Sequence, residues 1–100
     1  MSKTVVVQYK TRPDAAEENQ RLVEAVYAQL ASEDPGGFHY ATFRLEDGVT
    51  FVHIARAEDD DNPLSHLAAF AEFQRNILDR CVEPPSSRGA TIVGSYHFGL

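Results

Sequence analysis

The chain has 100 residues, of which 43% are hydrophobic and 24% are charged, so its composition is that of an ordinary globular protein and excludes intrinsic disorder. The net charge of −6, with lysine and arginine scattered along the chain, argues against nucleic acid and acidic membrane surfaces as partners, because both attract basic patches. At this length we expect a single domain over residues 1–100.

The first predicted elements are a strand and a helix. Residues 5–9 are β-branched and apolar on both faces, which predicts a central strand. From Asp14 to about Ser32 apolar residues recur at three- and four-residue spacing, which predicts an amphipathic helix. Its apolar stripe consists of Leu22, Val23, Val26, Tyr27 and Leu30. The Asp-Pro-Gly-Gly sequence at 34–37 predicts the end of this helix.

A β-hairpin is predicted over residues 38–45 and 49–57, with Asp47-Gly48 as a tight two-residue loop that pairs Leu45 with Thr50. One face of this hairpin is apolar and is predicted to be core: Ala41, Phe43, Leu45, Val52 and Ile54. The other face mixes aromatic, cationic and imidazole groups: Phe38, Tyr40, Thr42, Arg44, Phe51, His53 and Ala55. Such a mixture is unusual for a face that only fills space.

A second helix is predicted from Pro63 to about Val82, with Asn62 as its N-cap. Its inner stripe is predicted to be Leu67, Phe70, Ala71, Gln74, Ile77, Leu78 and Cys81. Residues 84–89 are predicted to be a loop, and residues 91–98 the last strand.

The predicted order, βαββαβ, is that of the ferredoxin-like fold, an α+β fold whose antiparallel sheet carries both helices on one face. The opposite face would still bear large apolar groups, so a second copy that covers it, forming a dimeric α+β barrel, is the simplest explanation. Cys81 is the only cysteine and no apolar run approaches the length of a membrane span, so we expect a cytoplasmic protein.

On this order and length, the chain resembles the antibiotic biosynthesis monooxygenase family over nearly its whole length. The resemblance is carried by residues 5–13, 34–40, 51–55 and 64–67, by Phe73, and by residues 94–96. It implies a homodimeric barrel with a ligand cleft between helices and sheet. It also implies oxidation of a small aromatic, polyketide or quinol-like compound by molecular oxygen, without any cofactor.

The chain departs from this family at one position and in one residue type. Ala55-Arg56-Ala57 stands where the family often has Glu-x-Trp. The chain contains no tryptophan, whereas haem-degrading relatives use a tryptophan beside their haem, so haem degradation is disfavoured. Isomerases and ligand-sensing modules share the fold, so the fold alone does not set the reaction.

Cofactor-free oxygenation needs a base that deprotonates the substrate and a donor for the developing oxyanion. His53 is the first candidate base, with Tyr40 and Arg44 on the same strand face as donor and oxyanion partner. Alternatively, these residues fill the barrel interior between two subunits, with Arg44 paired to an acid.

His66 is the second candidate catalytic residue, because the resemblance places a histidine near the start of the second helix; it could equally be an exposed surface histidine. Tyr9, Phe70 and Phe73 are most simply core aromatics that would also line the cleft. Residues 59–61, all aspartate, lack spacing that aims ligands at one point, so no metal site is predicted there.

Two functional hypotheses remain. The first is a cofactor-independent monooxygenase, and the second is a non-catalytic homodimer that holds a small ligand or partner. An enzyme predicts an enclosed cavity of a few hundred Å³ into which an imidazole points, whereas a purely structural dimer predicts that the same side chains pack solidly. An isomerase would share the cavity without consuming oxygen.

Overall fold

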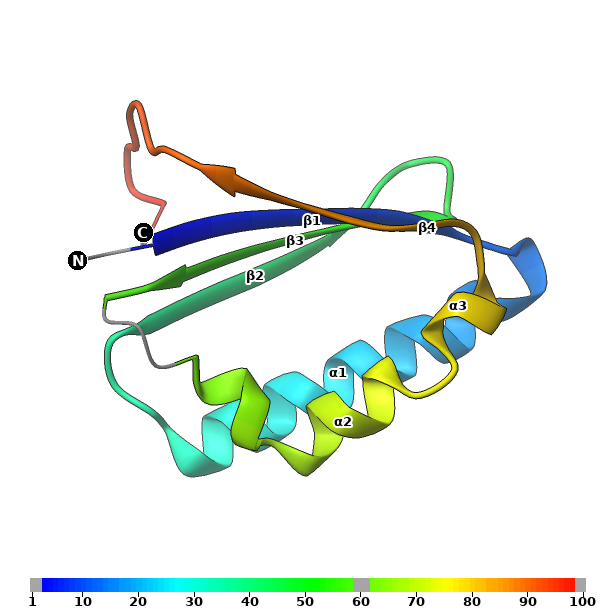
Figure 1. The fold of residues 1–100 in the computed structure, drawn as a ribbon, viewed down its shortest axis with the longest axis horizontal. Coiled ribbons are helices and arrows are strands. Elements are labelled where there is room, and N and C mark those ends of the chain that lie inside the picture. Colours follow the sequence, from blue (N-terminus) through cyan, green and yellow to red (C-terminus); the bar gives the residue numbers. More distant parts are fainter. Residues whose placement is uncertain (1–2, 59–61, 99–100) are drawn as a thin grey trace.

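A computed structural model describes residues 3–58 and 62–98, which form a four-stranded sheet with its helices on one face (Figure 1). The strands are β1 (Lys3–Thr11), β2 (Phe38–Arg44), β3 (Thr50–Ala57) and β4 (Cys81–Ala90). They lie in the order β2-β3-β1-β4, and all neighbouring pairs are antiparallel. This confirms the ferredoxin-like α+β fold and the central position of the first strand.

The first helix, α1 (Ala16–Glu33), follows a short 3-10 turn, η1 (Pro13–Ala15), close to the predicted position. Val23 and Val26 of the predicted stripe are buried against the sheet. Asp34 ends the helix in the left-handed conformation (φ 47°), and its N–H donates to the carbonyl of Leu30 at 2.7 Å. Aspartate tolerates this conformation better than most residues, so the helix ends where the sequence predicts.

The second helical region is not one continuous helix, so that part of the prediction is wrong. It consists of η2 (Pro63–His66), α2 (Ala68–Gln74) and α3 (Ile77–Arg80). Leu67 is extended between the first two pieces, and Asn76 is left-handed (φ 63°) between the last two. Because each break rotates the following residues, Leu78 of the predicted inner stripe is 67% exposed, whereas Phe73 is buried.

The last strand is β4 (Cys81–Ala90), not residues 91–98, and residues 84–89 are not a loop. It pairs with β1, with Thr4 opposite Ala90 at one end, and the register shifts near Lys10 at the other. The prediction failed because Pro84 and Pro85 look like strand breakers. Pro84 and Pro85 lie opposite Tyr9, at the register shift between the Gln8–Ser86 and Lys10–Glu83 pairs of this edge strand, and a bulge at an edge tolerates residues that have no N–H to donate.

The hairpin has the predicted register, with Arg44 opposite Phe51, but its loop is longer than two residues. The carboxylate of Asp47 organises this loop by accepting hydrogen bonds from the backbone N–H groups of Val49 (3.0 Å) and Thr50 (2.9 Å). The pKa of Asp47 is lowered to about 2, chiefly by the hydrogen bond with the Thr50 hydroxyl and further by these two backbone bonds. The Asp47 side chain therefore stabilises a connection that the sequence predicted to be a tight two-residue turn.

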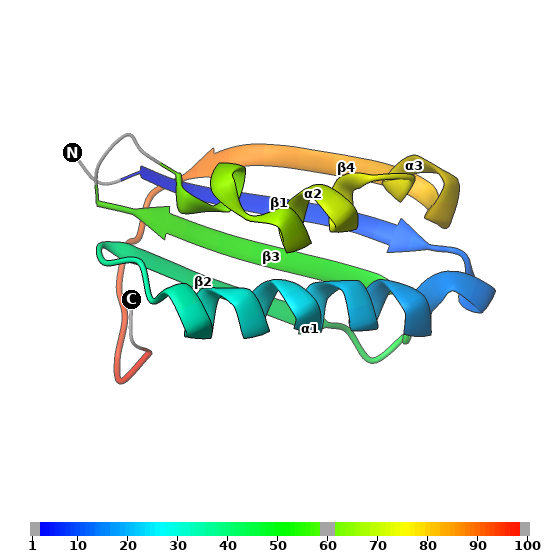
Figure 2. The ribbon, with the colours of Figure 1, turned by 90° about the horizontal axis from the view of Figure 1, so that it is seen from below.

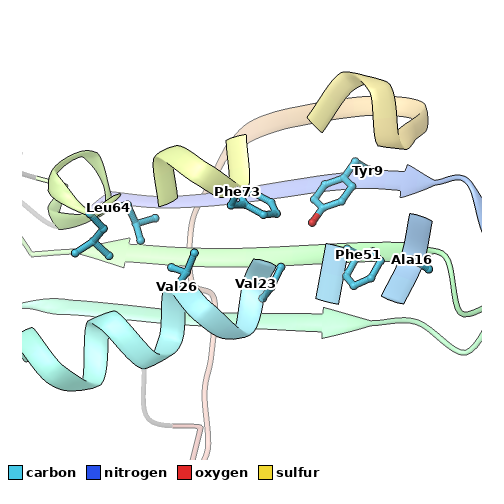
Figure 3. Close-up of a cluster of buried hydrophobic side chains, with 8 residues drawn as sticks. Tyr9, Ala16, Val23, Val26, Phe51, Leu64 and Phe73 are labelled. Carbon is cyan, nitrogen blue, oxygen red and sulfur yellow. The ribbon is translucent and has the colours of Figure 1, made fainter. Parts of the chain in front are cut away.

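The buried layer lies between the sheet and the helices, which contact one another and together span the sheet (Figure 2). It contains Tyr9, Ala16, Val23, Val26, Phe51, Leu64, Leu67 and Phe73 (Figure 3). The mixed face of the hairpin is therefore the covered face. The prediction that the apolar face is the core is wrong for the single chain, since Phe43 and Leu45 are 41% and 43% exposed. With apolar groups on both faces, the strand pattern does not indicate which face the helices cover.

The face of the sheet opposite the helices, called the open face below, is partly crossed by residues 91–98. They form a shallow hollow with Val6 and Ile54, and the ring of Phe98 stacks on Phe43 with centroids 6.5 Å apart. Among the described residues, no helix is long and apolar enough to cross a membrane.

Candidate functional site

A cavity of about 390 Å³ lies between the covered face of the sheet and the second helical region. Five of the predicted site residues line it: Tyr9, Tyr40, His53, Phe70 and Phe73. Lys3 is the only charged side chain among the described residues that line the cavity. The structure therefore brings together an imidazole, two phenols and two further aromatic rings in a mostly apolar space of ligand size.

His53 lies at the centre of β3, is 4% exposed, and has hydroxyl groups at both ring nitrogens. Its Nε2 is 2.8 Å from the Tyr9 hydroxyl, and its Nδ1 is 2.8 Å from the Tyr40 hydroxyl and 2.9 Å from that of Thr42. The Tyr9 and His53 rings also stack, with centroids 5.3 Å apart. The imidazole is thus held in one orientation.

These contacts follow from the register of the sheet. In β3, His53 lies opposite Thr42 of β2 and Val7 of β1. Tyr40 and Tyr9 are each two residues away along the neighbouring strands, on the same face. Diagonal neighbours lie within reach of long aromatic side chains, so both phenols meet the imidazole. Figure 3 shows the Tyr9 hydroxyl directed from β1 towards β3.

The hydrogen bonds continue beyond His53 in both directions. The Asn19 amide donates to the Tyr9 hydroxyl at 2.8 Å, and the Arg80 guanidinium donates to the Asn19 carbonyl at 3.2 Å. At the other end, the Tyr27 hydroxyl is 2.7 Å from that of Thr42. We call this set the His53 network: Arg80, Asn19, Tyr9, His53, Tyr40, Thr42 and Tyr27.

Burial keeps the titratable centre of this network uncharged at neutral pH. Desolvation lowers the pKa of His53 to about 4 and raises the pKa of both Tyr9 and Tyr40 well above the usual range. Burial also raises the pKa of Tyr27. A neutral imidazole at physiological pH keeps a lone pair, so it can act as a proton acceptor.

Two predicted residues lie away from the cavity. The Arg44 guanidinium donates to the Gly48 carbonyl (2.8 Å) and the Gln20 side chain (2.7 Å), and forms an ion pair with Glu17 (3.0 Å). The structure thus places Arg44 beside an acid rather than beside His53. His66 is exposed at the end of η2, outside the residues that line the cavity.

Sequence reasoning missed Asn19 and Arg80, which are 0% and 5% exposed. A signal for Asn19 was present, because it lies four and seven residues before Val23 and Val26 and so shares their helix face. A polar residue on a buried stripe needs a partner, and the sequence does not reveal which one. Arg80 could not have been found, because its position depends on the unforeseen break at Asn76.

The described residues contain no group of three or more His, Cys, Asp or Glu side chains that could hold a metal ion. Residues 59–61, where the sequence raised the question, lie outside the described residues. Cys81 packs against the core as a partly buried residue, and burial raises the pKa of its thiol, which makes it a poor nucleophile.

No protein-family model matches the chain, and no curated protein matches it significantly in sequence. Solved structures do match. An antibiotic biosynthesis monooxygenase is 18% identical with a TM-score of 0.69, covering 94% of this chain and 100% of that one. A variant of SnoaB, a cofactor-independent oxygenase from Streptomyces nogalater, is 17% identical with a TM-score of 0.68, covering 94% and 95%. Rv0793 from Mycobacterium tuberculosis is 16% identical with a TM-score of 0.74, covering 95% and 98%.

Proposed function

We propose that this chain, which has the fold of the antibiotic biosynthesis monooxygenases, is a cofactor-independent monooxygenase of a small aromatic, polyketide or quinol-like compound. The observation that supports this proposal is the neutral imidazole of His53 in a cavity of about 390 Å³ lined with aromatic rings. A neutral basic group that faces a mostly apolar space can serve to deprotonate an aromatic compound bound there.

The proposed reaction begins with removal of a proton. An electron-rich aromatic compound that has lost a proton can pass one electron to molecular oxygen directly. The resulting radical pair combines to form a C–O bond, and loss of water then leaves a carbonyl group. For an activated CH₂ group the balance is R₂CH₂ + O₂ → R₂C=O + H₂O, so the substrate supplies all the electrons that reduce oxygen.

Burial makes His53 a weak base, so proton transfer to it has a free-energy cost. Transfer of a proton from a phenol of pKa about 10 to a group of pKa about 4 costs about 8 kcal/mol. That cost fits within the barrier of about 16 kcal/mol of a reaction that turns over about ten times per second. The anion formed beside His53 also favours the imidazolium, which raises the pKa of His53 and reduces the cost.

The cavity favours a ligand that is neutral when it binds. Phe70 and Phe73 offer ring faces, and their centroids are 5.9 Å apart. Since Lys3 is the only charged side chain among the described lining residues, a carboxylate or phosphate deep in the cavity would remain unpaired. We therefore expect phenols, naphthols, anthrones or hydroquinones rather than acids.

The test is oxygen uptake by protein freed of metal with a chelator, measured against a panel of anthrones, naphthols and hydroquinones. We expect uptake above the uncatalysed rate, and a loss of about 10²- to 10⁴-fold in His53→Asn, the range typical of a general base. His66→Asn is the matched control and should keep its activity, because His66 is exposed and does not line the cavity. Activity that survives in His53→Asn but disappears in His66→Asn would transfer the role of base to His66.

A non-catalytic protein that binds the same class of ligand is the second candidate, and one observation favours it. Every buried side-chain nitrogen and oxygen among the described residues has a hydrogen-bond partner, including both nitrogens of His53. A saturated network of this kind can simply hold the fold in one arrangement. Saturable binding of 1-naphthol without oxygen uptake or isomerisation would establish this alternative.

We also propose that the chain forms a homodimer through the open face. Val6, Ile54, Phe43 and Leu45 would otherwise present apolar surface to water. A twofold axis places the same face of a second copy against it. Light scattering at micromolar concentration should give about twice the 11.1 kDa mass of the chain, and Ile54→Glu should reduce it to one chain. A monomeric wild-type mass would contradict the dimer.

A further inference from the structure

Asn19 is a buried polar side chain that the proposed reaction does not use. It is 0% exposed on the sheet-facing side of α1. Its Nδ2 is 2.8 Å from the Tyr9 hydroxyl and its Oδ1 is 3.2 Å from Nε of Arg80. Asn19 is thus a fully buried amide between a cation and the phenol that contacts His53.

Arg80 fixes the orientation of this amide. Arg80 is 5% exposed; its guanidinium lies 5.5 Å from the ring centroid of Phe73 and donates to the carbonyls of Phe73 (2.7 Å) and Arg75 (3.1 Å). Its Nε–H donates to Asn19. Because a guanidinium only donates, the atom of Asn19 that faces it must be the carbonyl oxygen, so the NH₂ group must face Tyr9.

The Tyr9 hydroxyl then has a defined role. It accepts a hydrogen bond from Asn19, and it also lies within hydrogen-bond distance of His53 Nε2. If Nε2 carried a proton, the Tyr9 oxygen would accept twice, and its own proton would have no acceptor among the described side chains and would face only the mostly apolar cavity that Tyr9 lines. If Nε2 is unprotonated, the Tyr9 hydroxyl donates its proton to Nε2, so that proton has an acceptor.

The contacts at Nδ1, the other ring nitrogen of His53, independently favour the same tautomer. The hydroxyl oxygens of Tyr40 and Thr42 lie 2.8 and 2.9 Å from Nδ1. A protonated Nδ1 can share its hydrogen between two oxygens, whereas an unprotonated one has a single lone pair for two donors. The Tyr40 hydroxyl is then free to donate elsewhere, and Tyr40 also lines a second hollow beside Tyr27.

We propose that Asn19, held by Arg80, is a positioning residue that keeps His53 in the Nδ1–H tautomer. Its basic Nε2 is then reached only through the Tyr9 hydroxyl. This inference rests on the proposed function for its catalytic meaning: the substrate hydroxyl would donate to the Tyr9 oxygen while the Tyr9 proton passes to Nε2. One O–H bond breaks in the substrate and one in Tyr9, while a new O–H bond forms on Tyr9 and an N–H bond forms on His53.

The tautomer can be measured without substrate. In protein labelled with nitrogen-15 at histidine, a long-range proton–nitrogen correlation spectrum at neutral pH distinguishes protonated from unprotonated ring nitrogens. The His53 signal is assigned by its loss in His53→Asn. We expect Nδ1 to be protonated and Nε2 unprotonated. A protonated Nε2 in the wild-type protein would overturn the inference.

Asn19→Asp tests the positioning role most sharply. The carboxylate still accepts from Arg80 but has no N–H to offer Tyr9, so Tyr9 donates to it and must accept from His53. We expect the His53 signal to change to the Nε2–H tautomer. Gln20→Glu is the matched control, since it makes the same chemical change on the same helix but contacts Arg44 instead. The control should keep Nδ1–H.

Arg80→Gln provides a second test if the first variant does not fold. A neutral amide at this position can either donate or accept, so it no longer fixes Asn19, and a mixture of His53 tautomers should appear. A pure Nδ1–H signal in the available variants would overturn the positioning role. With an active wild-type protein, Asn19→Asp should also lose oxygen uptake by about 100-fold or more.

This design separates the inference from the proposed function. A tautomer change in Asn19→Asp, in a protein that never consumes oxygen, supports the positioning role and rejects the enzyme. Oxygen uptake by a wild-type protein whose Nε2 is protonated supports the enzyme and rejects the positioning role.

Discussion

A simple rule predicts apolar side chains on the covered face of a sheet and polar side chains on the open face, and the two faces of this sheet differ in the opposite way. The covered face carries the His53 network, although it is buried beneath the helices. The open face carries Val6, Phe43 and Ile54, although the single chain leaves it largely uncovered. Polar groups inside and apolar groups outside match the two roles proposed above, a ligand site on the covered face and a contact between two copies on the open face.

The covered face tolerates its polar groups because they are paired. Each described buried nitrogen or oxygen of a side chain has a partner, so the cost of removing these groups from water is offset by hydrogen bonds. Burial also keeps His53 neutral by lowering its pKa to about 4. The stability of this face and the reactivity proposed for His53 would therefore depend on the same contacts.

The largest expected difference between the faces is in the free energy of unfolding that is lost when one phenylalanine on each face is replaced by alanine. Phe51, on the covered face, is 1% exposed, and Phe51→Ala should lower the free energy of unfolding by about 3–5 kcal/mol. Phe43, on the open face, is 41% exposed, and Phe43→Ala should cost about 1 kcal/mol in the dissociated chain. Urea unfolding at low protein concentration measures both.

The stability lost in Phe43→Ala should grow with protein concentration if two copies meet at the open face, because the dimer buries Phe43. The covered-face loss should not depend on concentration in this way. Equal losses for both variants in the dissociated chain would mean that the faces do not differ in burial as described.

The next largest effect is a pH dependence that only the covered face should show. The unfolded chain binds a proton at His53 near pH 6.5 and the folded chain near pH 4, so the unfolded state holds more protons between these values. The free energy of unfolding should therefore fall by about 3 kcal/mol as the pH is lowered from 6.5 to 4.

His53→Asn should remove this contribution, and His39→Asn should keep it, because His39 is partly exposed near Glu58. The measurement is chemical unfolding at a series of pH values. An identical pH profile in the wild-type protein and His53→Asn would show that His53 is not held neutral by burial.

The smallest effect concerns two threonines. Thr42→Val removes the hydroxyl that contacts both His53 and Tyr27, and should cost about 1–2 kcal/mol. Thr4→Val, at the rim of the open-face hollow, should change stability by less than about 0.5 kcal/mol. Thermal unfolding of both variants tests this, and a neutral Thr42→Val would remove Thr42 from the network.

The sequence predicted the elements that depend on local pattern. The stripe on α1, the register of the hairpin and the Asn62 cap, whose side chain accepts from the Leu64 N–H at 2.9 Å, were all confirmed. The last strand was missed because Pro84 and Pro85 are tolerated at a bulge of an edge strand, and both the edge position and the bulge are properties of the whole sheet.

The site was predicted in part for a related reason. Strand alternation placed Tyr40, Thr42 and His53 on one face, and the structure confirms that grouping. Alternation could not indicate which face the helices cover, nor that Arg44 would turn towards Glu17. Contacts that join distant parts of the chain, such as Asn19 with Arg80, depend on packing that no local pattern encodes.

The most direct test of the division between the faces is where a ligand binds. Backbone amide shifts of nitrogen-15-labelled protein, titrated with 1-naphthol without oxygen, report each position separately. We expect saturable shifts at Tyr9, His53 and Phe73, which line the covered cavity. Saturable shifts at Val6 and Ile54 of the open face, with the covered face unchanged, would contradict the account.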